Sequence, residues 1–261
     1  MRIAIGVEYD GTAYNGWQRQ ASGTGIQERL EAALSSVAGH PLEVHGAGRT
    51  DAGVHASGQV AHFDTTSRRA LRGWLLGANS NLPPDISLTW VRPVADDFHA
   101  RFSATERRYR YEILNRLVRS ALSRNRAWWV HRPLDAASMQ EAAQELVGRH
   151  DFSAFRAAGC QASHPVREVR TIDVRRAGER ILIDVVADAF LQRMVRNIVG
   201  TLAEVGAGEQ PPHWVGAVLK GRDRTLGGMA APGHGLTLVA VRYPDAYGIP
   251  ACGVSPCEPL P

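Results

Sequence analysis

Short strand patterns recur along most of this chain, and each half adds only two or three helix patterns to them. The first segment, residues 2–9, alternates, with Ile3, Ile5 and Val7 on one face and small or charged residues on the other. Because successive side chains of a strand point to opposite faces of a sheet, this alternation predicts a half-buried strand. A chain with so many strand patterns has to pair them in sheets and cover those sheets with its few helices.

The patterns divide the chain into two halves of similar build. Strands are predicted at residues 2–9, 42–45, 59–63, 86–94, 108–114, 127–131, 171–175, 181–188 and 236–243, and helices at 26–37, 70–79, 136–147, 190–205 and 213–219. This mixture predicts an α+β fold with two similar halves, each a mixed or antiparallel sheet packed with helices. We expect an N-terminal half at residues 1–104, a C-terminal half at 105–245 and a Pro-rich tail at 246–261.

The overall composition places few limits on the partner. The 261 residues carry a formal net charge of +4 and the sequence pI is about 9.2, which mildly favours an anionic partner such as nucleic acid. Three cysteines, at positions 160, 252 and 257, do not make a disulfide framework and fit a reducing compartment. The N-terminus lacks the long apolar run of a signal peptide or membrane helix, so we expect a soluble cytoplasmic protein without a membrane partner.

The most unusual segment is GAGRTDAGVH at residues 46–55. Its three glycines let the backbone turn tightly and let a ligand approach closely. Asp51 stands at its centre beside Arg49 and Thr50. A carboxylate in such a loop is placed as a reacting group would be. The alternative is a structural turn in which Asp51 caps the following element.

Other sequence motifs accompany this loop and together cover about residues 1–245. GRTDAGVHA is preceded by EYDGTAYNGWQRQ and followed by FHARFSATERRYRY, FLQRMVRNIVGTL and GRDRTL. Together, and in this order, they resemble the TruA family of tRNA pseudouridine synthases. Two positions depart from the family's pattern. Asp188 stands where Asn is usual, and Thr237 stands where an aromatic residue is common, but neither belongs to the catalytic set that the resemblance implies.

The resemblance implies an enzyme that isomerises uridine in folded RNA. The N1–C1′ glycosidic bond breaks, the uracil turns, and C5 bonds to C1′, with Asp51 as the catalytic carboxylate. The resemblance also implies no cofactor, the tRNA anticodon stem-loop (positions 38, 39 and 40) as target, a homodimer, and an active cleft between the two halves. The sequence agrees in having no P-loop, no dinucleotide fingerprint and no HExxH motif.

Two further residues are implied to contact the substrate base. Tyr109 maps onto the family's base-contacting tyrosine, in a strand where it shares a face with Tyr111 and Ile113. The alternative for Tyr109 is a role as a core aromatic. Arg49 maps onto an arginine that enters the RNA stem and fills the space of the flipped base. Its alternative is a surface salt bridge.

Arg196 is implied to be the arginine that pairs with the catalytic Asp51 and keeps its carboxylate ionised. The predicted helix at 190–205 also carries Arg193, three residues earlier and therefore a neighbour on its surface. Arg193 has two other interpretations, a phosphate contact or a solvated surface charge.

A cluster of arginines supplies a separate indication of RNA binding. Between residues 101 and 132 the only acids are Glu106 and Glu112. The arginines of this stripe are Arg101, Arg107, Arg108, Arg110, Arg116, Arg119, Arg124, Arg126 and Arg132. Aromatic residues are interleaved with them, and such a stripe suits a phosphate backbone, although a charge run is usually a solvated face.

Two other functions fit part of the sequence. A non-catalytic RNA-binding module needs the arginine stripe but not Asp51. A glycoside hydrolase also places a carboxylate at an anomeric carbon, but it typically needs a second carboxylate, for which Asp10 and Asp64 are distant candidates. The close histidines at 45, 55 and 62 match no common metal-ligand spacing, so we expect them to be structural.

Overall fold

The computed structural model describes residues 1–20 and 23–250, which form two compact units of mixed helix and strand. The first unit contains Met1–Arg107 together with the chain from Leu238 onward, and the second contains Arg108–Thr237. The predicted α+β class is confirmed. The chain therefore returns to the first unit at its end, whereas the sequence-based division assigned residues 105–245 to the C-terminal half. Of the predicted Pro-rich tail, residues 251–261 and their two cysteines lie outside the described residues.

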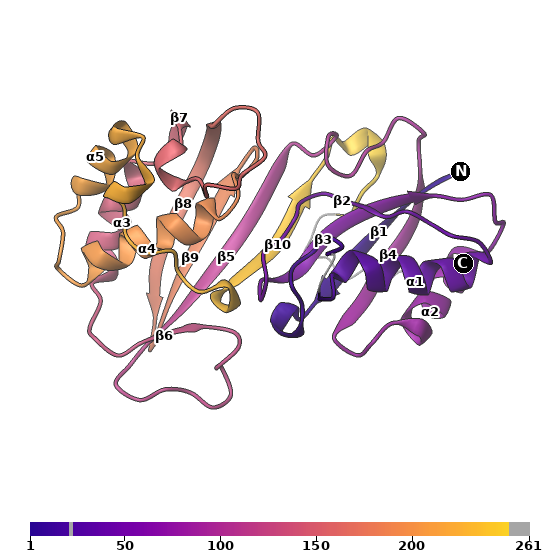
Figure 1. Ribbon diagram of the computed structural model, residues 1–261, viewed down its shortest axis with the longest axis horizontal. Coiled ribbons are helices and arrows are strands. Elements are labelled where there is room, and N and C mark those ends of the chain that lie inside the picture. The colour runs from indigo at the N-terminus through magenta and orange to yellow at the C-terminus, as the bar shows by residue number, and fades with distance from the viewer. Residues whose placement is uncertain (21–22, 251–261) are drawn as a thin grey trace. The chain divides into compact units, whose positions relative to one another are not determined.

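In the first unit, β1 lies between β3 and β4 and pairs antiparallel with both, while β2 pairs antiparallel with β3. The helices α1 and α2 pack against each other, and α2 packs on β4 (Figure 1). The elements are β1 (Arg2–Tyr9), α1 (Ile26–Ala38), β2 (His45–Gly46), β3 (His55–Asp64), α2 (Leu71–Asn81), β4 (Ile86–Val94) and the final strand β10 (Leu236–Arg242).

β1 is buried on both faces, so the prediction of a half-buried strand is wrong. Ile3 and Ile5 are fully buried on one face, and Ala4 is fully buried on the other. A Cβ on Gly6 would lie 2.1 Å from Nε1 of Trp90, so the glycine leaves room for the indole from β4. The lack of a side chain at Gly6 therefore reflects close packing and not exposure to solvent.

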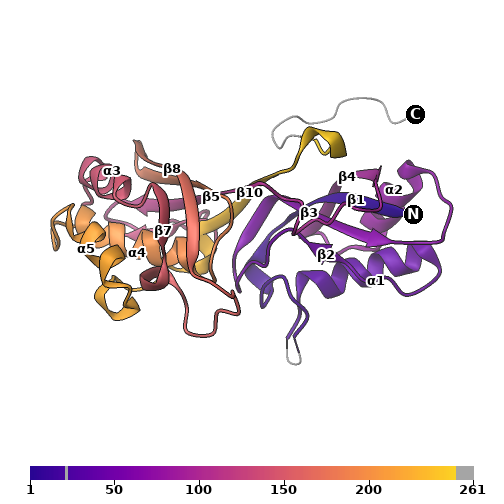
Figure 2. The same cartoon turned by 90° about the horizontal axis from the view of Figure 1, so that it is seen from above.

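The second unit has the strand order β5-β9-β8-β7, with β6 parallel to β5. The helix α3 packs on β8 and on α4, and Figure 2 shows α3, α4 and α5 together beside these strands. The elements are β5 (Glu106–Asn115), β6 (Trp128–Val130), α3 (Ala136–Gln144), β7 (Gly148–Asp151), β8 (Val166–Ala177), β9 (Arg180–Ala187), α4 (Met194–Gly206) and α5 (Trp214–Gly221). Short 3-10 helices are η1 (Gly11–Ala13), η2 (Ser153–Phe155), η3 (Arg224–Leu226), η4 (Gly233–Gly235) and η5 (Asp245–Tyr247).

Several sequence-based elements differ from the structure; the strand predicted at 171–175, for example, extends over Val166–Ala177. The strand predicted at 42–45 is reduced to β2, because side chains of α1 take the backbone N–H groups of Leu42 and Val44. The helix predicted at 136–147 ends at Gln144, and the polar strand β7 that follows was not predicted. The helix predicted at 190–205 begins only at Met194.

Within the described ranges, no helix combines the length and the apolar character that crossing a membrane would require. The longest α-helices have 13 residues, and both lie in units where they pack against neighbouring elements.

We expect Trp74→Ala to lower the free energy of unfolding by about 3–5 kcal/mol, since it empties a large core site. Trp74 is fully buried on α2, and its ring centroid lies 5.2 Å from that of Phe63 on β3. Leu76→Ala is the matched control, because Leu76 lies on the same helix with 49% of its surface exposed, and it should change stability by about 0.5 kcal/mol or less. Chemical denaturation of both variants tests this; equal losses would contradict the assigned core.

Candidate active site

The loop at residues 46–55 is held by backbone hydrogen bonds on both sides of Asp51. Trp17 N–H donates to the Thr50 carbonyl (3.0 Å), Gly53 N–H donates to the Tyr14 carbonyl (3.3 Å), and an isolated antiparallel bridge joins Gly16 to Asp51. Asp51 is half-buried, whereas its neighbour Thr50 is buried. The loop is therefore a fixed support that leaves its central carboxylate partly accessible to solvent.

Close backbone approach explains why a glycine stands at position 16. Gly16 has φ of +104°, and a Cβ there would lie 2.5 Å from the Thr50 carbonyl oxygen. The Thr50 hydroxyl is in turn hydrogen-bonded to the Tyr9 hydroxyl at 2.8 Å. Burial raises the pKa of Tyr9 to about 12, so this phenol stays protonated and keeps a proton for the bond at neutral pH.

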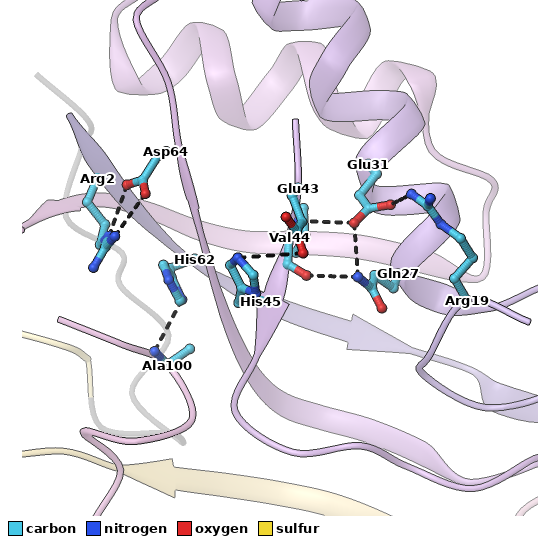
Figure 3. A network of polar contacts seen from close by, with 10 residues as sticks. All are labelled: Arg2, Arg19, Gln27, Glu31, Glu43, Val44, His45, His62, Asp64 and Ala100. Atoms are coloured by element: carbon cyan, nitrogen blue, oxygen red, sulfur yellow. Dashed lines mark hydrogen bonds and ion pairs between the residues drawn. The ribbon is translucent and has the colours of Figure 1, made fainter. Parts of the chain in front are cut away.

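A buried glutamate supports the start of the loop from α1 (Figure 3). Glu31 is 5% exposed, and its Oε1 accepts hydrogen bonds from Gln27 Nε2 (3.0 Å) and from the backbone N–H of Val44 (3.1 Å). Its other oxygen is paired with Arg19. Glu31 was not predicted from the sequence, because its role depends on its contacts with Val44 and Arg19 outside the helix.

Both alternative carboxylates of the hydrolase hypothesis have other partners in the structure. The Asp10 Oδ1 atom accepts from Thr12 N–H (3.0 Å) and lies 3.1 Å from Nδ1 of the buried His55. Asp64 is paired with Arg2 at 2.8 Å, and the hydrogen bond from that guanidinium holds the pKa of Asp64 below its usual range. Asp64 is thus ionised at neutral pH and cannot donate a proton there.

Arg49 is exposed on this loop, next to the buried Thr50. Its side chain is therefore accessible to a macromolecular substrate from the same segment that carries Asp51. The histidines at 45, 55 and 62 do not converge. His45 and His62 stack with ring centroids 5.0 Å apart, while His55 lies by Asp10. Across residues 1–20 and 23–250, no three His, Cys, Asp or Glu side chains gather as a metal site.

In the second unit, Arg196 is half-buried in the first turn of α4 and is tied to the segment before β10. Its Nε donates to the Ala231 carbonyl at 2.7 Å, and Ala231 N–H donates to the Arg196 carbonyl at 3.0 Å. Arg193 lies outside the helix with a left-handed φ of +61°, so its predicted place beside Arg196 on the helix surface is wrong. A non-glycine residue in this conformation marks a sharp, constrained entry into α4.

Tyr109 lies on the buried face of β5, as its alternation predicted, and it is 7% exposed. Its ring meets that of Phe190 edge-on, with centroids 5.1 Å apart and an interplanar angle of 88°. Phe190 precedes the turn into α4, so Tyr109 and Arg196 belong to neighbouring elements of one unit. Burial of this degree is also what a core aromatic shows, and the base-contacting role of Tyr109 stays a prediction.

Asp188, which departs from the family's usual Asn, sits in the same turn. Its Oδ1 accepts hydrogen bonds from the backbone N–H groups of Glu168 (3.0 Å) and Ala189 (2.6 Å). Both bonds need only an acceptor oxygen, which the amide of Asn also provides. The substitution therefore preserves the turn.

Several arginines of the stripe have partners within the protein. Arg108 and Arg110 both reach the buried carboxylate of Asp184, at 3.2 and 2.9 Å. Arg116 pairs with Glu179 and Arg132 with Glu209, and Arg107 donates to backbone carbonyls. Arg101, Arg119, Arg124 and Arg126 are exposed, and so are the ion-paired Arg108 and Arg132. The ion pairs therefore make the net positive charge of the stripe smaller than the sequence count suggested.

With this arrangement in place, comparison with known proteins identifies the class to which the fold and the Asp51 loop belong. The family model described as tRNA pseudouridine synthase matches residues 5–103 and 142–244. The chain belongs to this family, which confirms the resemblance drawn from its sequence blocks.

Its relatives match along nearly their whole length. A protein of Hydrogenovibrio crunogenus named tRNA pseudouridine synthase A is 53% identical, with 95% of each chain covered. Proteins of the same name from Xanthomonas euvesicatoria and Coxiella burnetii are 54% and 52% identical, covering 96% and 98% of this chain and 98% of each relative. A structural alignment with a chain of a solved Cbf5-Nop10-Gar1 complex includes 90% of this chain and 48% of the other, at 11% identity. Its TM-score of 0.36 is too low to support a conclusion.

Gly16→Ala should distort the Asp51 loop, because the new methyl group meets the Thr50 carbonyl as well as adding backbone strain. We expect it to lower the free energy of unfolding by about 1–3 kcal/mol and to reduce activity in the folded fraction. Gly39→Ala is the control, since Gly39 also has a positive φ (+77°) but a Cβ added there would meet no atom within 4 Å. A Gly16→Ala variant as active and stable as Gly39→Ala would disprove the close approach.

Proposed function

We propose that this chain isomerises uridine to pseudouridine in the anticodon stem-loop of tRNA, at positions 38, 39 and 40. The observation that carries the proposal is membership of the tRNA pseudouridine synthase family over residues 5–103 and 142–244. The Asp51 loop supports it, because a half-buried carboxylate on a hydrogen-bonded loop is held ready to react.

The reaction needs bond cleavage, rotation and bond formation within one nucleotide. The N1–C1′ bond breaks, the uracil turns, and C5 bonds to C1′; N1 gains a proton and C5 loses one, so the atoms balance without a second substrate. A single carboxylate, Asp51, suffices for the proton movement at C5. Three routes remain open for its first step: attack on the sugar, attack on the base, or stabilisation of a cleaved intermediate.

The other site residues are proposed around this carboxylate. Arg196 is the proposed partner that keeps Asp51 ionised, supported by its half-buried position and its fixed guanidinium. Tyr109 is proposed to contact the uracil, and its neighbour Phe190 holds its ring edge-on. Arg49, exposed beside Asp51, is proposed to fill the space that the flipped base leaves.

The remaining parts of the proposal concern the assembly. We propose a cytoplasmic homodimer in which one tRNA contacts both subunits, acting without a metal or nucleotide cofactor. The isomerisation consumes no redox equivalents and no group donor, which is consistent with this assignment. Molar mass measured in solution, alone and with tRNA, tests the dimer directly.

Asp51→Asn should reduce pseudouridine formation by at least about 10³-fold while tRNA affinity stays nearly unchanged, since an amide keeps the shape but is a poor base and nucleophile. Unmodified tRNA transcripts, mapped for pseudouridine at single-nucleotide resolution, give the activity and the modified positions together. Asp97→Asn, an exposed acid of the same unit, is the control and should retain full activity. Turnover of Asp51→Asn near that of the control would refute the assignment.

Replacing an exposed arginine by Ala should affect tRNA binding, whereas replacing Arg196 should affect the rate. Arg119→Ala removes an exposed cation, so it should weaken all tRNAs alike, make the salt dependence of binding shallower by about one unit or less, and spare the saturated rate. Arg196→Ala should lower the saturated rate more than affinity. Binding titrations and single-turnover assays on both variants separate the roles; the reverse pattern would exchange them.

A further inference from the structure

A row of aromatic rings lies in the first unit, outside the residues assigned above. The ring centroids of His45 and His62 are 5.0 Å apart, those of His62 and His99 are 4.7 Å apart, and those of His99 and Phe102 are 4.4 Å apart. His62, in the interior of the row, is 1% exposed, whereas Phe102 at one end is 75% exposed. The row is therefore anchored in the core through His62 and presents Phe102 to solvent.

The turn that carries Phe102 is rigid. His99 Nδ1 accepts from the backbone N–H groups of Arg101 (3.1 Å) and Phe102 (3.4 Å), so the imidazole organises the turn from within. Ser103 closes it, because its N–H donates to the His99 carbonyl and its hydroxyl accepts from His99 N–H, both at 2.9 Å.

The same turn is fastened to the sheet below it. Ala100 N–H donates to His62 Nδ1 at 3.2 Å (Figure 3), and the Tyr243 hydroxyl donates to the Ala100 carbonyl at 2.7 Å. Phe98 and Ala100 are fully buried. Phe102 thus stays exposed although its own turn is fixed, so its ring is already held in place and a ligand that contacts it pays little ordering cost.

The charge of this surface suits an anionic, aromatic ligand. The Arg101 guanidinium lies 5.5 Å from the centroid of the Phe102 ring. Burial lowers the pKa of His62 to about 4, with His99 and His45 adding to the effect, and burial also lowers the pKa of His99. These two imidazoles are therefore neutral at neutral pH, so the positive charge beside Phe102 comes from arginine and not from histidine. The acid Glu43 lies 3.9 Å from His45, at the opposite end of the row.

The ring row adjoins the loop that carries Asp51. Arg107 donates to the Arg101 carbonyl (2.6 Å) and to the Ala47 carbonyl (3.2 Å), so one guanidinium joins the Phe102 turn to the start of the loop. His45 belongs to β2, which leads directly into that loop. On β3, His62 pairs with Ala4, whereas Ala56 pairs with Tyr9, whose hydroxyl contacts Thr50 beside Asp51. About 20 Å of strand therefore separates the row from the Asp51 end, and a polynucleotide bound over Asp51 would reach the row several nucleotides away.

We propose that Phe102, together with His99 and Arg101, forms a stacking platform for an unpaired base of the RNA substrate, several nucleotides from the one that reaches Asp51. The inference rests on the proposed function and adds a contact to it. Stacking on an aromatic ring accepts any base, while Arg101 reaches the adjoining phosphate, so the platform provides affinity and position rather than sequence selection.

The test compares Phe102→Ala with Phe102→Trp and with Leu76→Ala, an exposed apolar side chain on α2 of the same unit. Phe102→Ala should weaken binding of an unmodified tRNA transcript by about 5- to 150-fold, the range found when one stacked base loses its aromatic partner. Phe102→Trp should restore affinity, because it restores the stacking face, and Leu76→Ala should bind like the unaltered protein. The saturated rate should be unchanged in all three, and binding of fully base-paired RNA should not respond to Phe102→Ala.

Three results would overturn the platform. Affinity of Phe102→Ala within about twofold of the unaltered protein would remove the contact. Dissociation of an oligomer by Phe102→Ala, seen as a fall in molar mass without RNA, would assign the ring row to a second copy of the chain. Equal weakening of paired and unpaired RNA would assign the loss to general electrostatics or folding. Absence of pseudouridine with the unaltered protein would instead refute the proposed function, and the binding comparison would still decide the platform.

Discussion

The buried carboxylate of Glu31 is the interaction on which the arrangement of the first unit depends. A carboxylate taken out of water is costly unless its oxygens are satisfied, and here Gln27, Arg19 and the Val44 backbone N–H satisfy them. Val44 directly precedes β2 and lies outside the strand itself. Its backbone N–H donates to the Glu31 carboxylate instead of to a neighbouring strand. Removal of Glu31 would release the segment that leads into β2 and the Asp51 loop.

A second buried carboxylate has the same effect in the second unit, with a consequence for RNA binding. Asp184 on β9 is 5% exposed and holds Arg108 and Arg110 against the sheet. Satisfying this buried charge fixes two guanidinium groups whose other contacts are then limited. The paired carboxylate offsets part of their charge, so the number of arginines along the chain overstates the net charge offered to a phosphate backbone.

The parts of the fold that sequence patterns predicted are those in which local preference and packing agree. β4 (Ile86–Val94) has the predicted bounds, and α1 differs only at its last residue. The failures have long-range causes. Side chains of α1 accept hydrogen bonds from the N–H groups of residues 42 and 44. The polar strand β7 forms through backbone pairing with β8. Because Arg193 has a left-handed conformation, α4 begins later than predicted. The Asp51 loop was recognisable because glycines and a central carboxylate are local features, whereas Glu31 and the ring row depend on contacts between distant segments.

Rigidity links these observations to the chemistry. An isomerisation that uses one carboxylate gains most from holding the reacting groups in position, since orientation alone removes much of an activation barrier. The Asp51 loop is fixed by Gly16 and Trp17, and the Phe102 turn is fixed by His99. Arg107 joins the two through carbonyl oxygens of both segments, so displacement of either one would strain the other. A base stacked on Phe102 would instead add binding energy equally to the bound substrate and to the transition state, which raises affinity without changing the rate of the bound complex.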